Sequence, residues 1–409
     1  MSMTSQPSEL SEGRLDLSLG DGEDAALNRS VARDTVQSVS SADGPGATPR
    51  TGAEESTSNE EKSPSEDPLR IRNQVRVSEP LESALAQRYG AVLSDLDGVV
   101  YAGPSAIPGA TEALEKLEDI GVALAYVTNN ASRSSAEVAA HLRALGAPAT
   151  AEQVFGSALA GAELLAEQVP PGATVLVTGS AVLARHVAEQ GLVPVTTADP
   201  LPDAVIQGFE PTLGWKDLAE AAFAVAGGAV WVATNTDMSF PQARGIAPGN
   251  GTLVAAVSAA TGKAPIVAGK PEAQLFKTAA NHLGVHEALV VGDRLDTDIL
   301  GGNRAGMATA LVLTGVDTAE NALAAVTEQR PMYLFSDLGQ LHQPYPDITE
   351  RDGVYTSGGS RANVEDGVVI MGGARENVDT WRAGCAAWWA ASPRQHTASL
   401  PPLRFLDEE

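Results

Sequence analysis

The sequence predicts an α/β fold in which a parallel β-sheet with crossover helices is interrupted by a second α/β unit. Two observations lead to this prediction. Short apolar runs alternate with stretches of helical periodicity, which is the order expected for parallel strands joined by helices. The apolar runs after residue 264 resume the character of those before residue 151, so the residues between them form an insertion into one sheet domain.

Composition limits the partners that this chain can have. Its 409 residues are enough for two or three domains, and 43% of them are hydrophobic, as is usual for a globular protein. The formal net charge is −25, from 52 acidic and 27 basic residues. This charge argues against a nucleic-acid or anionic-membrane partner. An anionic substrate would therefore need a site that is locally positive.

Other sequence features bear on the compartment. The single cysteine, Cys385, cannot form an intramolecular disulfide and suits a reducing compartment. The chain shows neither the start of a signal peptide nor an apolar run of about 18 residues, the length that a membrane helix needs. We therefore expect a cytoplasmic protein without a membrane span, and the sequence leaves a homodimer open.

Residues 1–76 differ in composition from the rest of the chain. They are rich in Ser, Glu, Asp, Gly and Thr and almost lack aromatic residues. Such a segment cannot bury enough apolar surface to offset its conformational entropy. We predict a disordered acidic tail over this range.

Residues 77–150 form the first part of the predicted sheet domain, in which helices and strands alternate. Proline near a helix start, glycine after a helix end and serine at a helix start mark the boundaries. The predicted elements, in order, are a short helix within residues 81–90, a strand from Ala91, a helix over Pro108–Ile120, a strand over residues 122–130 and a helix over Ser134–Leu145, capped by Ser134 or Ser135.

Residues 151–264 form the insertion, which we call the inserted unit. It alternates helix and strand like a second α/β domain. Its predicted helices cover Phe155–Glu167, Ala181–Glu189, Trp215–Ala226 and Gly251–Thr261, and its predicted strands cover Thr174–Val177, Ala204–Gly208 and Ala229–Ala233.

The sheet domain resumes over residues 265–343. A helix is expected at Glu272–Leu283, followed between residues 288 and 315 by a strand, an acidic loop, a helix and a strand. Residues 344–409 form a C-terminal extension to which the sequence assigns no role. Its first part alternates like a β-hairpin, and Val378–Ala391 is predicted to be a helix.

The sheet domain is organised around residues 91–101, AVLSDLDGVVY. An apolar run ends there in Asp95 and Asp97, which an extended backbone would point to one side. Gly98 allows a tight turn directly afterwards. Ligands of open α/β sheets bind at the carboxyl ends of the strands, so these two carboxylates are candidate site residues.

Four groups of polar residues follow predicted strands in this way. Charged residues are almost never buried unpaired, so core packing does not explain them. The groups are Asp95 with Asp97, Thr128 with Asn129, Lys270, and Asp293 with Asp298.

The chemistry that needs this set is phosphoryl transfer through an aspartyl-phosphate. We assign Asp95 as the covalent nucleophile. Asp97 would protonate the leaving alkoxide and later deprotonate water. Neighbouring carboxylates repel one another and the phosphate, so we expect Mg²⁺, a hard cation that prefers oxygen ligands. Asp293 would bind this metal together with Asp95, and Asp298 would hold a water molecule or a ligand of the metal.

The phosphate itself needs donors and positive charge. Thr128 offers a hydroxyl group, and the N–H groups that follow it, at Asn129 and Asn130, can bind phosphate oxygens. Lys270 supplies a fixed positive charge, which the net charge of −25 makes necessary.

Four motifs in this chain resemble those of the haloacid dehalogenase superfamily of phosphatases. They are DLDGVVY, VTNN, AGKP and GDRLDTDI, and the resemblance covers about residues 79–339. It implies a Rossmann-like core with Asp95 as nucleophile and Asp97 as acid/base. It also implies that Thr128 and Lys270 bind phosphate. The implied Mg²⁺ site is formed by Asp95, Asp97, Asp293 and Asp298.

The inserted unit lies where subclass IIA of this superfamily carries a large α/β cap, and its segment VATNTDMSFP is similar to that subclass. This resemblance implies that Asn235 binds substrate and that Asp237 lies near the substrate entrance. A polar hairpin turn would explain Asp237 equally well.

The resemblance also implies the substrate class, a small phosphorylated metabolite. The alanine-rich sequence and the C-terminal extension resemble actinobacterial members that are proposed to hydrolyse glycerol 3-phosphate. That ester is therefore the leading expectation, with 2-phosphoglycolate and p-nitrophenyl phosphate as further substrates.

Two other functions stay open from the sequence. A phosphotransferase or phosphomutase would use the same site, with a sugar hydroxyl in place of water. A receiver-like module would accept a phosphoryl group on aspartate without turnover. A dehalogenase is disfavoured, because it gives no role to Asp97 or to the metal-binding acids.

Overall fold

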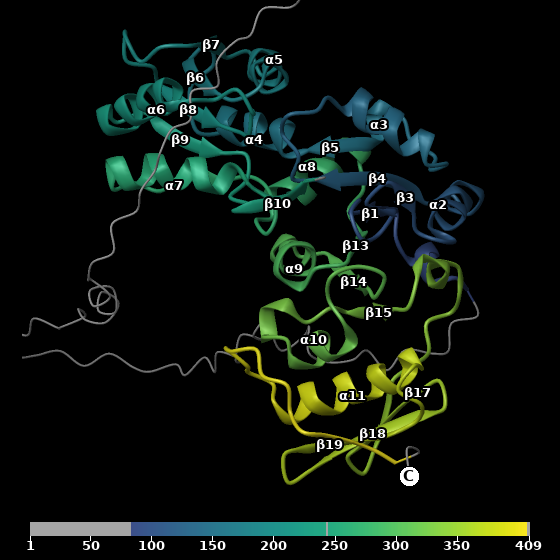
Figure 1. Ribbon diagram of the computed structural model, residues 1–409. Coiled ribbons are helices and arrows are strands. Elements are labelled where there is room, and N and C mark those ends of the chain that lie inside the picture. The colour runs from purple at the N-terminus through teal and green to yellow at the C-terminus, as the bar shows by residue number, and fades with distance from the viewer. Residues whose placement is uncertain (1–82, 243, 407–409) are drawn as a thin grey trace, which may run out of the picture. The chain divides into compact units, whose positions relative to one another are not determined.

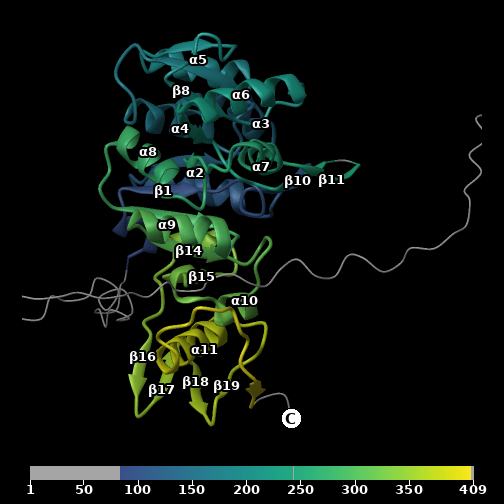
Figure 2. The same ribbon diagram turned by 90° about the vertical axis from the view of Figure 1, so that its left-hand side faces the viewer.

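The computed structural model of this chain describes residues 83–242 and 244–406. The tail predicted over residues 1–76 lies outside the described residues. The ribbon views show the described helices and strands in three groups, each built around one sheet (Figures 1 and 2).

The first group is a parallel six-stranded sheet. Its order is β15-β14-β13-β1-β4-β5, and every neighbouring pair is parallel. This sheet confirms the predicted α/β class. The strands are β1 (Ala91–Ser94), β4 (Ala123–Thr128), β5 (Val154–Gly156), β13 (Ala288–Gly292), β14 (Ala308–Val312) and β15 (Tyr333–Phe335).

Helices cover both faces of this sheet. Val92 of β1 packs into the apolar cluster that contains Leu114 and Leu142, whereas its neighbour Leu93 packs with Phe276 on the other face. This alternation is what a strand buried on both faces requires. The covering helices are α2 (Ala110–Asp119) and α3 (Ser135–Ala144) on one face and α8 (Gln274–Leu283) on the other, with α9 (Leu300–Ala305) following β13.

Helix α3 begins where the sequence predicts. The Ser134 hydroxyl accepts a hydrogen bond from the Glu137 N–H (3.3 Å), and the Ser134 N–H donates to the Glu137 carboxylate (2.8 Å). The two bonds form a capping box, which satisfies donors that the first turn leaves free.

The inserted unit is built on a second parallel sheet of order β12-β9-β8-β6-β7. Its strands are β6 (Thr174–Thr178), β7 (Val193–Val195), β8 (Ala204–Gln207), β9 (Val230–Ala233) and β12 (Ile266–Val267). The apolar clusters place α4 (Ser157–Ala166) and α5 (Ala181–Glu189) on one face, and α6 (Trp215–Gly227) and α7 (Asn250–Thr261) on the other. A hairpin of β10 (Ser239–Gln242) and β11 (Gly245–Pro248) extends away from α7 (Figure 2).

The predicted boundaries of the inserted unit differ from the strand pairings. The predicted helix at Phe155 begins too early, because Val154–Gly156 pairs with β4 as the edge strand of the first sheet. Ile266–Val267 pairs with β9 and so belongs to the second sheet, although the prediction placed it in the sheet domain. Short strands at a sheet edge carry too little periodicity to be assigned from sequence.

The C-terminal extension forms a sheet of order β16-β17-β18-β19-β20, and helix α11 lies across β17, β18 and β19 (Figure 1). The predicted hairpin pattern and helix are both confirmed. The elements are β16 (Thr349–Arg351), β17 (Val354–Ser357), β18 (Ser360–Glu365), β19 (Val368–Gly372), α11 (Val378–Ala391) and β20 (Leu403–Phe405).

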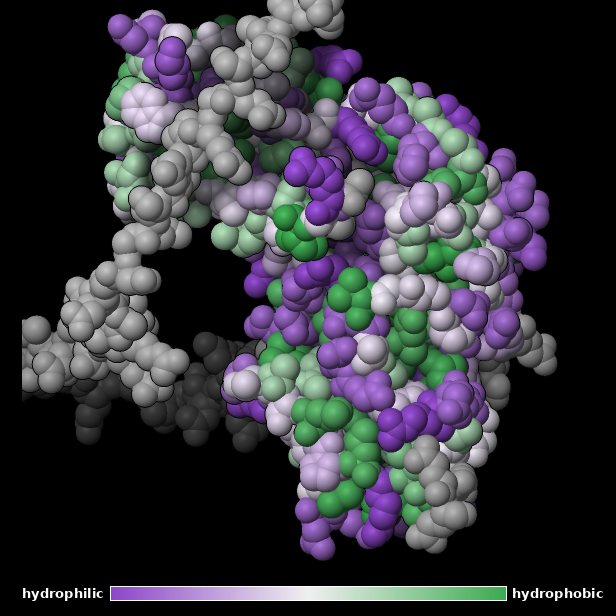
Figure 3. Space-filling view, in the orientation of Figure 1, coloured by the Kyte–Doolittle hydropathy of each residue, from purple (hydrophilic) through white to green (hydrophobic). Residues whose placement is uncertain are grey.

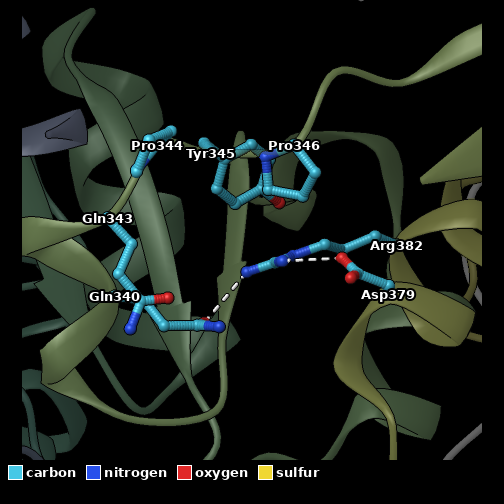
Figure 4. A pocket seen from close by; sticks show the side chains of 7 residues that line it. All are labelled: Gln340, Gln343, Pro344, Tyr345, Pro346, Asp379 and Arg382. Carbon is cyan, nitrogen blue, oxygen red and sulfur yellow. Dashed lines mark hydrogen bonds and ion pairs between the residues drawn. The ribbon is translucent and has the colours of Figure 1, made fainter. Parts of the chain in front are cut away.

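Arg382 of α11 ties this extension to the first sheet, and Figure 4 shows its bonds to Gln340 and Asp379. Its guanidinium donates to the carbonyl of Leu334 in β15 (2.7 and 3.0 Å) and to the side chains of Gln340 (2.9 Å) and Asp379 (2.8 Å). It also lies 4.3 Å from the ring centre of Tyr345. Arg382, Gln340, Tyr345 and Asp379 line a cavity of about 250 Å³. A buried arginine with four hydrogen bonds fixes the position of α11 against the sheet.

The remaining elements are short. They are β2 (Tyr101–Ala102), β3 (Ser105–Ala106), α10 (Ala319–Ala324) and the turns η1 (Leu85–Arg88), η2 (Ala151–Gln153), η3 (Leu295–Ile299), η4 (Thr327–Gln329) and η5 (Leu338–His342). The helix predicted within residues 81–90 is thus a single 3₁₀ turn.

None of the helices in the described ranges is both long and apolar enough to cross a membrane. Hydrophilic side chains gather over α2 and α3 in the space-filling view (Figure 3).

Candidate active site

The site begins at the carboxyl end of β1, in the middle of the first sheet. The four residues of β1 are buried, and the Asp95 N–H extends the ladder by donating to the Val291 carbonyl (2.8 Å). Gly98 then turns the chain with a φ of 78°. A Cβ atom at Gly98 would overlap the Asp293 carboxylate, so glycine is what allows the two acidic segments to approach.

Asp95, Asp293 and Asp298 bring their carboxylates together. One oxygen from each lies within 4.8 Å of one oxygen from each of the others, and Asp293 and Asp298 are 2% and 1% exposed. Asp293 follows β13, the neighbour of β1. Asp298 lies in the π-helical turn η3, where an acidic loop was predicted. Carboxylate oxygens are the donors that Mg²⁺ prefers, so this set fits the predicted metal.

The side chain of Asp97 lies outside this group among the described residues. The chain bends at Leu96, whose carbonyl accepts from the Val100 N–H (2.9 Å), so Asp95 and Asp97 do not lie on one straight strand. The Asp97 carboxylate instead accepts from the Tyr101 hydroxyl (3.3 Å). Of the four carboxylates that the prediction assigns to the metal, the structure therefore brings together three: those of Asp95, Asp293 and Asp298. Partial desolvation by its surroundings raises the pKa of Asp97, although the Tyr101 hydrogen bond and the charge of Lys270 lower it in part.

Lys270 contacts the carboxylates from the segment that follows a strand of the second sheet, not of the first. Its Nζ lies 2.5 Å from Asp95 Oδ1 and 2.7 Å from Asp298 Oδ1. The sequence placed it after a strand of the first sheet, but it follows β12, the last strand of the second sheet. The lysine is therefore held by the chain as it returns from the inserted unit.

Burial and like charges dominate the electrostatics of the site. Burial, and then the negative charges of Asp95 and Asp298, raise the pKa of Asp293 to about 7. Burial also raises the pKa of Asp298, and the ion pair with Lys270 offsets part of this effect. Burial alone would lower the pKa of Lys270, but Asp298 and Asp95 outweigh it and raise this pKa above its ordinary value. The site thus holds an excess of negative charge that a divalent cation would neutralise.

A loop after β14 holds Asp293 in place. The Val316 N–H donates to the Asp293 carboxylate (2.8 Å), and the Asp317 N–H donates to the backbone carbonyl of Asp293 (3.0 Å). Asp317 in turn accepts from the Leu295 N–H (2.7 Å). Sequence reasoning missed this loop because its partners lie 22 or more residues away and share no local motif.

Thr128 is the last residue of β4, and Asn130 lies in the turn that follows it. The Thr128 hydroxyl accepts from the Asn130 N–H (3.2 Å). The Asn130 side chain accepts from the N–H groups of Ser132 (3.0 Å) and Arg133 (2.9 Å). These bonds form an Asx turn beside the strand that carries Asp95, so the Asn130 side chain shapes the loop.

Asn129, between these two residues, contacts the inserted unit. Its carbonyl accepts from the Asn235 side chain (2.7 Å), and its Nδ2 donates to the Asp237 carboxylate (3.1 and 3.2 Å). Burial raises the pKa of Asp237, and the Asn129 hydrogen bond lowers it in part. The structure therefore brings Asn235 and Asp237 against the loop after β4.

Arg294 is a further charged residue that sequence reasoning did not single out. It donates to Asp296 through two bonds of 3.0 and 2.9 Å, and its positive charge lowers the pKa of Asp237 in part. Its place directly after Asp293 in the motif was the signal that could have found it.

Comparison with known proteins agrees with this geometry. The family model described as haloacid dehalogenase-like hydrolase matches residues 92–193, and the one described as HAD-hydrolase-like matches residues 267–341. D-glycerol 3-phosphate phosphatase of Mycobacterium tuberculosis is 50% identical over 260 residues, which are 64% of this chain and 73% of that protein. Acid sugar phosphatase of Staphylococcus saprophyticus is 37% identical over 257 residues, covering 62% of this chain and 97% of that protein.

Solved structures are similar as well. The crystal structure of the M. tuberculosis glycerol phosphate phosphatase in complex with magnesium matches with a TM-score of 0.70 and 43% identity, covering 80% of this chain and 95% of that one. The p-nitrophenyl phosphatase of Archaeoglobus fulgidus matches with a TM-score of 0.56 and 31% identity, covering 62% of this chain and 98% of that one.

Proposed function

Because this chain belongs to the haloacid dehalogenase-like hydrolases and is a phosphatase, we propose that it hydrolyses small phosphate monoesters with Mg²⁺ through an aspartyl-phosphate on Asp95. The observation that carries this proposal is the meeting of three carboxylates and one lysine at the end of β1. Two of these carboxylates and the lysine are almost fully buried, which is costly unless the group serves a ligand.

In the first step, a carboxylate oxygen of Asp95 attacks phosphorus and the bond from phosphorus to the leaving oxygen breaks. Asp97 gives its proton to that oxygen, which leaves as an alcohol. In the second step, Asp97 takes a proton from water, whose oxygen attacks the aspartyl-phosphate. Inorganic phosphate leaves and the Asp95 carboxylate is restored.

The remaining site residues would bind the negatively charged oxygens of the phosphoryl group. The Lys270 amine, beside Asp95, would neutralise a phosphoryl oxygen, and Thr128 with the N–H groups after it would bind the others. Mg²⁺ bound by Asp95, Asp293 and Asp298 would supply Lewis-acid stabilisation of the negative charge on the phosphoryl group.

We propose glycerol 3-phosphate as the preferred ester. The support is the 50% identity to a glycerol 3-phosphate phosphatase, together with the charge of the inserted unit near the site. That unit places a carboxylate, Asp237, against the loop after β4. A carboxylate accepts hydrogen bonds from glycerol hydroxyls but repels the carboxylate of 2-phosphoglycolate.

Phosphate release from a panel of esters tests this proposal. We expect kcat/KM for glycerol 3-phosphate to exceed that for 2-phosphoglycolate by about tenfold, which corresponds to about 1.4 kcal/mol. p-Nitrophenyl phosphate and sugar phosphates belong in the same panel. A higher kcat/KM for 2-phosphoglycolate would contradict the assignment of the substrate, and no release from any ester would contradict the proposed function.

Tyr101→Phe is expected to shift the pH dependence of kcat. The variant loses the hydroxyl that donates to Asp97 and lowers its pKa, so the pKa of Asp97 should rise further. Asp97 must be protonated to act as the acid, so activity should persist to higher pH. A pH profile of kcat measures this, with Tyr355→Phe in β17 as the control. An unchanged alkaline limb would mean that Tyr101 does not act on Asp97.

A further inference from the structure

We propose that Asn129 is a positioning residue, whose side chain holds the backbone of Lys270 and joins it to the inserted unit. The inference rests on the proposed function, because it assumes that Lys270 takes part in phosphoryl transfer. It gives a role to the Asn129 side chain, beside the expectation that the backbone N–H of Asn129 binds a phosphate oxygen.

The Asn129 amide pairs with both backbone polar groups of Lys270. The Lys270 N–H donates to Asn129 Oδ1 (2.8 Å), and Asn129 Nδ2 donates to the Lys270 carbonyl (3.1 Å). The two residues are 141 positions apart in the chain. Two bonds to one residue fix its position and its rotation, which one bond would not. The Lys270 side chain then has a fixed origin from which to reach Asp95 and Asp298.

The same amide also contacts the inserted unit. Nδ2 has two hydrogens: one serves the Lys270 carbonyl, and the other is shared by the two oxygens of Asp237 at 3.1 and 3.2 Å. Oδ1 is taken by the Lys270 N–H. The side chain thus has both hydrogens and its oxygen engaged, and its backbone N–H is the group that could meet a phosphate oxygen.

Further bonds hold the loop after β4 against the inserted unit. The Asn129 carbonyl accepts from the Ser157 hydroxyl (2.6 Å) and from Asn235 Nδ2 (2.7 Å), and the Ala131 carbonyl accepts from the Ser180 hydroxyl (3.0 Å). Gly269, the residue before Lys270, has no room for a side chain, because a Cβ atom there would lie 2.6 Å from Asn129 Oδ1 and 2.5 Å from the Thr234 carbonyl. Lys270 is therefore packed between the loop after β4 and the inserted unit. Asn129, which lies in that loop, contacts both Lys270 and the inserted unit.

This arrangement predicts how Asn129 contributes to the rate. Misplacing a catalytic group by about 1 Å can cost on the order of 10²-fold, so we expect Asn129→Ala to lower kcat by about that factor. The effect should act through the lysine amine. In a Lys270→Met background, which has no amine to misplace, Asn129→Ala should change kcat by less than about threefold.

A double-mutant cycle of phosphate release from glycerol 3-phosphate tests this. The four proteins are the wild type, Asn129→Ala, Lys270→Met and the double variant. A much smaller effect of Asn129→Ala on kcat in the Lys270→Met background than in the wild type supports the proposal. An equal fold-loss of kcat in both backgrounds would overturn it, because it would mean that Asn129 acts on the phosphate independently of Lys270. Wild-type protein that releases no phosphate would instead contradict the proposed function.

A swap of the Asn129 and Asp237 side chains gives a second test if the Lys270→Met protein is too slow to measure. Asn129→Asp keeps the acceptor for the Lys270 N–H, but it loses the donor to the Lys270 carbonyl and sets two carboxylates against each other, and only the second of these effects is reversible at Asp237. Adding Asp237→Asn removes that repulsion and should recover about tenfold of the lost kcat, equal to about 1.4 kcal/mol. No recovery in a folded protein would overturn the link to the inserted unit.

Asn321→Ala controls for a loss of stability alone. The Asn321 side chain accepts from the Thr318 N–H (3.0 Å) in the capping box of α10. Its removal should lower Tm and leave kcat unchanged, whereas Asn129→Ala should lower kcat even at temperatures well below its Tm.

Discussion

Asp95→Asn is expected to lower kcat for phosphate release by on the order of 10⁴-fold or more, because the amide cannot serve as a covalent nucleophile. The asparagine side chain has nearly the same shape as that of aspartate. It also removes one of three negative charges that repel one another, so the fold should tolerate the substitution. The Lys270 amine keeps its bond to Asp298 (2.7 Å) when the charge of Asp95 is removed.

Phosphate release and thermal unfolding should be measured on the same preparation. Asp296→Asn is the matched control. It lies in the same acidic motif as Asp298 but is exposed and paired with Arg294, outside the three-carboxylate group. We expect this control to keep its activity within about threefold, as is usual for surface changes. Substantial turnover by Asp95→Asn would rule out an aspartyl-phosphate on this residue.

Removal of Mg²⁺ should abolish phosphate release, and re-addition should restore it. Without the cation, three carboxylates and the phosphate share one site. Among the described residues, Lys270 is the one cationic side chain within bonding distance of Asp95 and Asp298. We expect kcat to fall by at least about 10²-fold in EDTA. Unchanged activity in EDTA, with metal loss verified, would contradict the assignment of these carboxylates as a metal site.

The raised pKa of Asp293 makes this metal effect depend on pH. Its pKa is about 7 in the folded, metal-free protein, against an ordinary value of 3.8. The folded state therefore binds more protons than the unfolded state between these values, and the free energy of unfolding falls as pH rises through about 7. Mg²⁺ binds the deprotonated carboxylate and should offset this loss.

The expected result is a larger rise in Tm on adding Mg²⁺ at pH 8 than at pH 5. Thermal unfolding with and without the cation measures it. Asp293→Asn should raise the Tm of the metal-free protein at pH 8 and remove most of the response to Mg²⁺. An equal response to Mg²⁺ at both pH values in the wild type would contradict the raised pKa.

The sequence by itself determined the class of fold and pointed to the candidate site residues. Apolar runs of strand length, helix caps such as Ser134 and the polar residues after each run are local signals. They correctly placed β1, β4, β13 and the helices between them. The four motifs also identified Asp95, Asp293, Asp298 and Lys270, which the structure brings together.

Only the tertiary structure decided how these residues meet. The side chain of Asp97 leaves the carboxylate group because the chain turns from Leu96, which an extended strand pattern does not indicate. Lys270 follows a two-residue strand of the second sheet, too short to be assigned from its residues. Asn129 turns to Lys270 and Asp237, which lie 141 and 108 positions away. Periodicity and caps act within one element, whereas these contacts depend on how the two sheets pack, and no local pattern encodes that packing.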